Sequence, residues 1–330
     1  MHTQVLDRAE GALVGLALGD ALGMPTQSMS PTQIQATYGR IESLVSASAD
    51  QPIAPSLEAG RVTDDTEQAI ILAKQIEGGF SIRSYARQLL AWEEQMRARG
   101  SLDLLGPSTK AALQLVREGA DIAKVGKEGA TNGAAMRICP AGIAYRPGSE
   151  LISRVQTITE LTHGSSIGIS GAVAVAVTVS CALEGGPLPE AIAEGVAACS
   201  RPRGNWVAGA TIAARFTTFE QLSRNLSGAD FTRFLREVVG TSLQSQESVV
   251  AALLIAVHYA ERPFEALLEG ANLGGDTDTI AAIAGAMLGA AHGSAGFPHE
   301  QVALVERINE LDFAALARPL VAMREERSHG

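Results

Sequence analysis

Two acidic motifs near opposite ends of the chain restrict its fold more than any other feature. The first, Thr63–Thr66, reads Thr-Asp-Asp-Thr and opens an apolar helical segment that continues to Glu77. The second, Asp276–Thr279, reads Asp-Thr-Asp-Thr and opens the segment Ile280–Ala291, which is apolar on nearly every face. A helix that is apolar all round is typical of a protein core. The second motif is therefore predicted to lie at the edge of the core and not on an open surface.

Helix capping is the simplest explanation of either motif taken singly. Asp and Thr are favoured N-cap residues, and negative charge stabilises a helix N-terminus. Capping accounts for one acid at each helix, but not for threonine together with two aspartates at both. If the two helix starts meet, four carboxylates converge: those of Asp64, Asp65, Asp276 and Asp278. Such a group must raise its pKa values, find cationic partners or bind metal, and Arg61 is the only basic residue close in sequence.

The oxygen ligands indicate which metal would fit. Carboxylates and hydroxyls without patterned His or Cys favour a hard cation, so Mg²⁺ or Mn²⁺ is predicted, with Ca²⁺ as an alternative. Two ions would balance four acids, and dinuclear sites with ions about 3.5–4 Å apart can generate a hydroxide between them. The spacing differs from that of an EF-hand, whose ligands alternate along one short loop.

The composition favours long helices packed through small side chains. Hydrophobic residues make up 46% of the chain and aromatic residues only 4%, and most segments have helical periodicity. We therefore expect an all-α fold with one domain over residues 1–330. Helices are expected to start near Val5, Thr66, Ile82, Ser108, Glu150, Ser165, Leu188, Phe231, Ser248, Phe264, Thr279 and Gln301. Loops are expected at Tyr38–Arg61, Ser200–Asn205 and Asn272–Gly275.

Charge and hydropathy exclude several classes of protein. The net charge of −10, with no basic run, argues against a nucleic-acid partner. The longest apolar stretch, Ile167–Leu183, is short for a membrane span and contains Ser and Thr, so it is predicted to be a buried helix. Only 3 cysteines, widely spaced, fit no zinc knuckle or disulfide framework. Together with an N-terminus that lacks a signal pattern, they predict a cytoplasmic location.

Four sequence blocks, taken in order, carry a family resemblance. They are Gly11–Gly23, Thr63–Thr66, Thr131–Arg137 followed by Thr162-His163, and Gly274–Thr279. Over roughly residues 8–295 their order and spacing resemble those of the ADP-ribosylglycohydrolases, the family that includes dinitrogenase-reductase-activating glycohydrolase and the J1 crystallins. Each block is short, but the ordered set is specific.

The resemblance implies a compact all-α domain with two Mg²⁺ or Mn²⁺ ions in a central cleft. By that resemblance the metal ligands are Thr63, Asp64, Asp65, Asp276, Asp278 and Thr279. The residues predicted to be catalytic are Asp64, Asp65 and Asp278. In relatives a metal-activated water attacks the anomeric carbon of a ribosyl group, so the chain is expected to be a glycosyl hydrolase.

Candidate substrate residues lie in the blocks between the acidic motifs. Asn132, Gly133, Ala134, Met136 and Arg137 fit a loop that turns into a helix, with free N–H groups for a phosphate or ribose, although an ordinary helix start would look the same. His163 matches a histidine that lines the ribose pocket of relatives, but a lone histidine can equally be structural.

Three further residues need separate interpretation. Asp20, in the glycine-rich end of the first block, is either a helix cap or an acid that supports the site. Gln27 stands where many relatives have Glu; it keeps hydrogen bonds but cannot carry charge. Trp206 lies in a Pro/Gly loop and could stack on a base or pack on the surface.

Three functions remain open at this point. The first is an ADP-ribosyl hydrolase that acts on modified proteins or ADP-ribose adducts, and the second is a small-molecule, nucleoside-like ribosidase. A non-enzymatic ligand-binding or crystallin-like protein is the third, which the complete metal motifs disfavour. A diphosphate pocket needs cationic walls, for which Arg137, Arg201 and Arg203 are the candidates; if they point away, the nucleoside hypothesis gains. The leaving group and the oligomeric state do not follow from the sequence.

Overall fold

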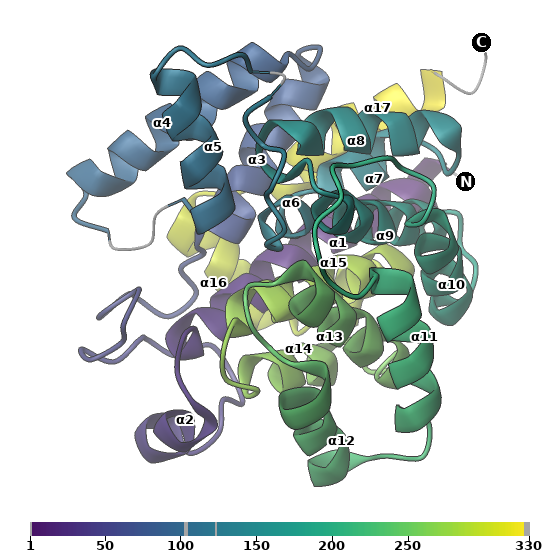
Figure 1. Cartoon of the computed structure of the whole chain (residues 1–330). Helices are drawn as coiled ribbons and strands as arrows, with labels where there is room; N and C mark the ends of the chain where they lie inside the picture. The colour runs from purple at the N-terminus through teal and green to yellow at the C-terminus, as the bar shows by residue number, and fades with distance from the viewer. Residues whose placement is uncertain (1, 102–104, 123, 327–330) are drawn as a thin grey trace.

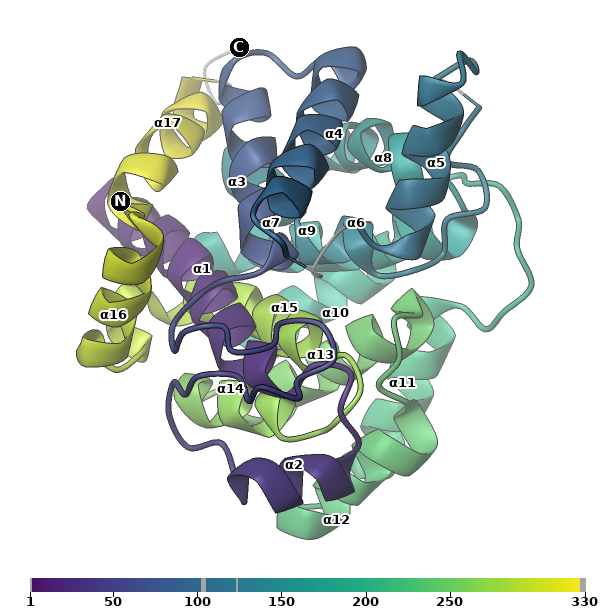
Figure 2. The same ribbon diagram turned by 90° about the vertical axis from the view of Figure 1, so that its left-hand side faces the viewer.

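The computed structural model describes residues 2–101, 105–122 and 124–326, and within them the chain is all-α, as predicted. Two helices, α1 (His2–Gly23) and α15 (Thr277–His292), run side by side through the middle of the molecule (Figures 1 and 2). Three more helices complete the centre: α9 (Ser166–Leu183), α13 (Ser245–His258) and α14 (Pro263–Ala271). These central helices carry much of the single large hydrophobic cluster that forms the core.

The remaining helices surround this centre in three groups. On one side lie α3 (Asp64–Glu77), α4 (Ile82–Ala98), α5 (Pro107–Arg117), α6 (Gly133–Met136), α7 (Cys139–Ala144) and α8 (Ser149–His163). On another lie α10 (Leu188–Ala198), α11 (Ile212–Ser223), α12 (Gly228–Phe234) and the π-turn η2 (Leu235–Val239). The outer elements are η1 (Met24–Thr26), α2 (Pro31–Tyr38), η3 (Ser294–Gly296), α16 (His299–Asn309) and α17 (Phe313–Glu326).

Helices α1 and α15 approach so closely that backbone touches backbone. A Cβ atom on Gly15 would overlap with the carbonyl of Gly285, and a Cβ on Gly11 would overlap with Gly289. The chain can bring two long helices to this distance only because glycine recurs every fourth residue of α1 and so stays on one face. The small residues of α1 and α15 thus allow helices from near opposite ends of the chain to pack against each other.

The apolar stretch predicted to be a buried helix is α9. It is the one helix of the described residues that is long and apolar enough to cross a membrane, and 83% of that window is buried inside the protein. Such burial is expected for the central helix of a large core.

Most predicted helix starts fall within a few residues of the observed ones, but the sequence patterns do not predict α2, α7, α11 or α17. For α2 a signal was present: Ser30 and Gln33 form a reciprocal capping box, and Pro31 occupies the first helical position. The predicted loop Tyr38–Arg61 is confirmed, since no helix occurs between the end of α2 and the start of α3.

Candidate active site

The two acidic helix starts meet, as predicted. The hydroxyl of Thr279, at the start of α15, donates to Oδ2 of Asp65, at the start of α3, over 3.2 Å. Three other aspartates of the motifs, Asp64, Asp276 and Asp278, line one cavity of about 320 Å³. Stretches of chain far apart in sequence therefore place three carboxylates in the wall of one cavity, and the fourth, that of Asp65, is bonded to the wall residue Thr279.

The structure shows that the acidic motifs are not explained by helix capping. The N-cap residues, Thr63 of α3 and Asp276 of α15, make no side-chain capping hydrogen bond. The start of α3 is instead capped by Asp20 of α1, whose carboxylate accepts from the hydroxyls of Thr63 and Thr66 at 2.7 and 2.5 Å. It also accepts from the backbone N–H groups of the same two residues. Because a third acid caps the helix, Asp64 and Asp65 are left for another role.

The second motif is held in place by a tight turn. Gly274 and Gly275 both have positive φ, at 82° and 81°, which glycine adopts at little cost. The carbonyl of Gly275 accepts from Ser28, its N–H donates to Met29, and the N–H of Asp276 donates to the carbonyl of Thr241 at 2.8 Å. The turn is thereby fixed to two other segments before α15 begins.

Glycine also fixes the position of Asp278 from the side of α1. A Cβ on Gly23 would overlap with the Cα and N atoms of Asp278. The carbonyl of Gly23 accepts from the hydroxyl of Thr277 over 2.9 Å. The end of α1 thus sets the distance between the two motifs.

Burial and mutual repulsion perturb the acids strongly. Asp65 and Asp278 are 1% and 3% exposed. Loss of solvation, followed by the charges of the neighbouring carboxylates, raises the pKa of both well above its usual range. Desolvation also raises the pKa of Asp276 to about 6 and that of Asp20 to about 6. The group is unfavourable as four anions unless a cation lies among them.

Two oxygen atoms show where a cation would be accepted. Among the described residues, Oδ1 of Asp65 and Oδ1 of Asp278 are buried without any hydrogen-bond partner. A buried, unpaired carboxylate oxygen is costly, and hard divalent cations prefer such oxygens. The donor set therefore fits Mg²⁺ or Mn²⁺.

The described residues do not form a closed cage. No three of their acidic, histidine or cysteine side chains are close enough together to hold one ion between them. The negatively charged carboxylates repel one another, which favours this separation. The predicted ligand set also includes two neutral oxygens, the hydroxyls of Thr63 and Thr279. Any bound ion would have to draw these oxygens together.

Several predicted substrate residues do line the cavity. Asn132, Gly133, Met136 and Gln27 all belong to its wall, together with Thr279. The amide of Asn132 donates to Oδ2 of Asp276 and to the hydroxyl of Ser248, the latter over 2.9 Å. The amide nitrogen of Gln27 is buried and has no hydrogen-bond partner in the described part of the chain.

Four other predicted substrate residues are not part of this wall. Arg137 is 1% exposed and packs behind the wall, and His163 is fully buried there. Ala134 is also buried, whereas Trp206 is 78% exposed on its loop. The cationic wall expected from Arg137, Arg201 and Arg203 is thus not formed by these arginines, none of which lines the cavity.

The sequence patterns missed much of the cavity wall. It includes Ile53, Leu243 and, around the start of α5, Leu105, Gly106, Pro107, Thr109 and Lys110. Lys110 is the only basic side chain among the described residues that line this cavity. No periodicity marked these residues, because they belong to loops and helix ends that meet only in the fold.

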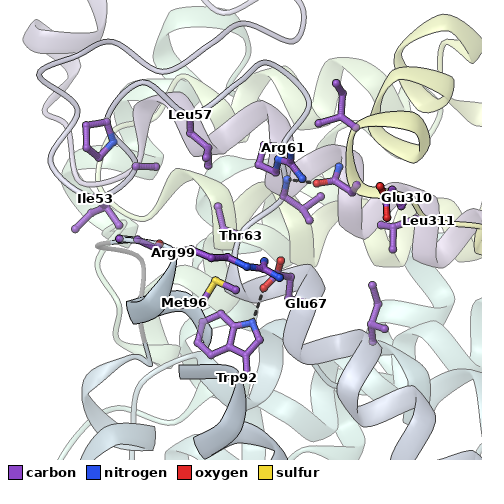
Figure 3. Close-up of a pocket in the computed structure, with 18 residues that line it drawn as sticks. Ile53, Leu57, Arg61, Thr63, Glu67, Trp92, Met96, Arg99, Glu310 and Leu311 are labelled. Atoms are coloured by element: carbon purple, nitrogen blue, oxygen red, sulfur yellow. Dashed lines mark hydrogen bonds between the residues drawn. The ribbon is translucent and has the colours of Figure 1, made fainter. Parts of the chain in front are cut away.

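A larger cavity of about 720 Å³ lies on the other side of the start of α3 (Figure 3). Thr63 and Ile53 belong to its wall, and Ile53 is shared with the smaller cavity. Glu67 accepts a hydrogen bond there from the indole N–H of Trp92. The aspartates of the two motifs do not line this space, so its size alone does not make it the reaction centre.

Comparisons with known proteins identify the family of the chain. A family model described as ADP-ribosylglycohydrolase matches residues 1–330. The chain is 32% identical to the YegU protein of Escherichia coli (strain K12), covering 97% of this chain and 98% of that one. It is 31% identical to the ADP-ribosylarginine hydrolase Tri1 of Pseudomonas putida (strain GB-1), covering 91% and 74%.

A solved structure titled as an ADP-ribosylglycohydrolase-related protein complex has the same fold. It superposes with a TM-score of 0.67 at 24% identity, covering 97% of this chain and 99% of that chain. With the whole-chain family match and the two acidic motifs in one site, the chain belongs to the ADP-ribosylglycohydrolase family.

Proposed function

We propose that this chain is a Mg²⁺- or Mn²⁺-dependent hydrolase that cleaves ADP-ribosyl adducts at the anomeric carbon of the ribosyl group. The observation that carries the proposal is the pair of buried, unpartnered carboxylate oxygens of Asp65 and Asp278. They lie in a glycohydrolase-family chain, beside a cavity whose wall includes Asp278.

Six residues would hold the ions: Thr63, Asp64, Asp65, Asp276, Asp278 and Thr279. When bound, two such ions would supply an activated water and a polarised substrate oxygen. The positions of the acids are set by the protein, through Asp20 at the first motif and through the 274–276 turn at the second.

The other residues of the cavity would bind and orient the ribosyl group. Asn132 holds the carboxylate of Asp276, and Gly133 offers a backbone surface without a side chain. The buried amide of Gln27 would donate a hydrogen bond to a ribosyl oxygen. Leu105, Met136 and Leu243 would exclude water from the hollow.

Lys110 is the residue proposed to meet the diphosphate. Its ammonium group is a compact positive charge at the cavity wall. This role replaces the one predicted for Arg137.

A small-molecule, nucleoside-like ribosidase is the second candidate. The observation in its favour is that Arg137, Arg201 and Arg203 all lie outside the cavity wall, which leaves one lysine as the cationic group. A nucleoside lacks the diphosphate and would not need them. We propose a cytoplasmic location for either activity, and a protein-attached or small ribosyl compound as the partner.

The deciding experiment is a substrate panel at fixed Mg²⁺ with ADP-ribosyl-arginine, ADP-ribosyl-serine, O-acetyl-ADP-ribose and a set of nucleosides. Release of ADP-ribose that stops with chelator, and that is lost in Asp278→Asn, is the expected result. Cleavage of nucleosides alone would replace the first proposal with the second. If no ribosyl compound is cleaved with either metal, both hydrolase proposals fail.

A further inference from the structure

We propose that Arg137 is a positioning residue that orients Asp64 on one side and fixes the tautomer of His163 on the other. The inference deepens the proposed function, because Asp64 is a proposed metal ligand and His163 holds part of the substrate cavity. It rests on one unbroken line of hydrogen bonds through the protein interior. Arg137, at the end of α6, lies in the middle of that line.

The guanidinium of Arg137 is buried among neutral partners. It donates to Oε1 of Gln68 at 2.6 Å and to the hydroxyl of Thr162 at 2.6 Å, and more weakly to Thr109 at 3.4 Å. The guanidinium carbon of Arg137, Cζ, lies over the ring of Tyr85, 5.8 Å from the ring centroid. A buried charge with only neutral acceptors among the described residues is costly, so its retention calls for a specific role.

The first arm runs from Arg137 to the acidic centre. An arginine can only donate, so the side-chain oxygen of Gln68 must face Arg137 and its amide nitrogen must face the other way. That nitrogen donates to Oδ2 of Asp64 over 2.9 Å. Arg137 therefore holds Gln68 in the one orientation that supports the carboxylate of Asp64.

The second arm runs from Arg137 to the cavity wall. Thr162 accepts from Arg137. Among the described residues, the only acceptor within reach of its own hydroxyl proton is Nδ1 of His163, 2.8 Å away, so Thr162 donates to Nδ1. Nδ1 then carries no proton, and the neutral ring carries its proton on Nε2. Nε2 in turn donates to the hydroxyl of Thr131 over 2.9 Å, and Thr131 donates onward to Ser108.

The bond directions in this arm follow from two facts. The guanidinium can only donate to Thr162, and the protons of Thr162 and Thr131 find their acceptors in Nδ1 of His163 and in Ser108. Burial and the charge of Arg137 lower the pKa of His163 well below its usual range, which keeps the ring neutral. Thr131 lines the substrate cavity. His163 thus acts as a fixed donor to the wall and not as a base toward the substrate.

The tautomer of His163 can be measured without any turnover. In metal-free protein labelled with ¹⁵N-histidine, long-range proton–nitrogen spectra distinguish a ring protonated on Nε2 from one protonated on Nδ1. His163→Gln assigns the signal. The expected result is the Nε2–H tautomer in the parent protein and loss of that single tautomer in Arg137→Met and in Thr162→Val. An Nδ1–H ring in the parent, or an unchanged ring in folded Arg137→Met, would overturn the proposal.

The Asp64 arm is measured by Mg²⁺ binding in calorimetry. Loss of a residue that orients a metal ligand typically weakens affinity about 10–100-fold, and this is expected for Arg137→Met and for Gln68→Met. Thr162→Val should leave Mg²⁺ affinity near that of the parent, because it cuts only the other arm. Unchanged affinity in both Arg137→Met and Gln68→Met would contradict the first arm.

A control is available in Arg324, which is also 1% exposed and donates to backbone carbonyls, to Ser180 and to the carboxylate of Glu184, none of which lines the cavity. Arg324→Met should lower stability but alter neither the tautomer nor Mg²⁺ affinity. If Arg137→Met does not fold, Gln68→Met and Thr162→Val test the arms one at a time. If the parent binds no Mg²⁺, the proposed function fails, and the tautomer result still decides the second arm.

Discussion

Asp20 of α1 accepts two hydrogen bonds from Thr66 of α3, one from its hydroxyl at 2.5 Å and one from its backbone N–H at 3.2 Å. An acid from the first helix thereby completes the start of the helix that carries Asp64 and Asp65. Because Asp20 caps α3, the helix start does not depend on Asp64 or Asp65 for its cap. Substitution of Asp20 should therefore affect both folding and catalysis.

Asp20→Ala should lower the free energy of unfolding by about 1–3 kcal/mol, because it leaves buried donors of α3 without an acceptor. It should also reduce hydrolysis, since the first motif loses its anchor. Urea unfolding and initial rates would measure the two effects. Asp312, which caps the exposed start of α17 through Ala315, provides the comparison: Asp312→Ala should cost about 1 kcal/mol and leave hydrolysis unchanged.

The effect of Asp278→Asn on stability should depend on Mg²⁺: neutral or stabilising without the metal, and destabilising relative to the parent protein when Mg²⁺ is present. Without metal the substitution removes a buried charge that repels Asp65 and Asp276, so the melting temperature should rise or stay level. With Mg²⁺ the parent should gain stability, by about 2.7 kcal/mol at a hundredfold excess over Kd, and the variant should gain much less. Thermal melts with chelator and with Mg²⁺ test this, and an equal response of the two proteins would contradict the proposed ligand role.

Asn132→Asp should lower the rate of hydrolysis far more than Ser248→Ala does. The new carboxylate would face Asp276 and add a fifth negative charge to the site, whereas Ser248→Ala removes only one neutral hydrogen bond to Asn132. Single-turnover rates at saturating Mg²⁺ compare the two variants. Similar rates would show that Asn132 does not control the charge at Asp276.

Lys110→Met should separate the two candidate substrate classes. If the lysine meets a diphosphate, KM for an ADP-ribosyl adduct should rise about tenfold, as for the loss of one charge-assisted hydrogen bond. KM for a nucleoside should not change. Steady-state kinetics with both substrates would measure this, and equal effects would rule out a diphosphate role for Lys110.

Gly23→Ala should disturb the site through the backbone of Asp278. The added methyl would overlap with Asp278, and α1 and α15 would have to separate, at a cost of about 1–3 kcal/mol. Gly15→Ala makes the same kind of overlap with Gly285, farther along the helix pair. Both variants should lose stability in urea, but only Gly23→Ala should weaken Mg²⁺ binding. Equal Mg²⁺ affinity in the two would mean that Gly23 has no special influence on the motif.

The sequence allowed the acidic centre to be predicted because its signal is local. Each motif places its acids within four residues, directly before an apolar helix, and charge alone then required a partner. The same local logic identified α9 as a core helix. Asp20 was recognised as a cap or a supporting acid, but nothing in the sequence could show that it caps α3 instead of its own helix.

The walls of the cavity could not be predicted in the same way. Lys110, in the first turn of α5, and Leu243, in the loop before α13, come together there only in the folded chain, and neither helical periodicity nor a local motif indicates such a long-range contact. Arg137 was predicted to bind substrate because it follows a loop that turns into a helix. Its true partners, Gln68 and Thr162, lie on two other helices, so its burial was not visible from its neighbours in the chain.

The contact between α1 and α15 also bears on how the protein is made. The hydroxyl of Thr277 reaches the carbonyl of Gly23 across 254 positions of sequence, so α1 leaves the ribosome long before its partner helix has been synthesised. Until then its glycine face stays uncovered. Such long-range closure slows folding and lengthens exposure to aggregation, and a nascent chain released before α15 would have neither its central helix pair nor its second set of acids.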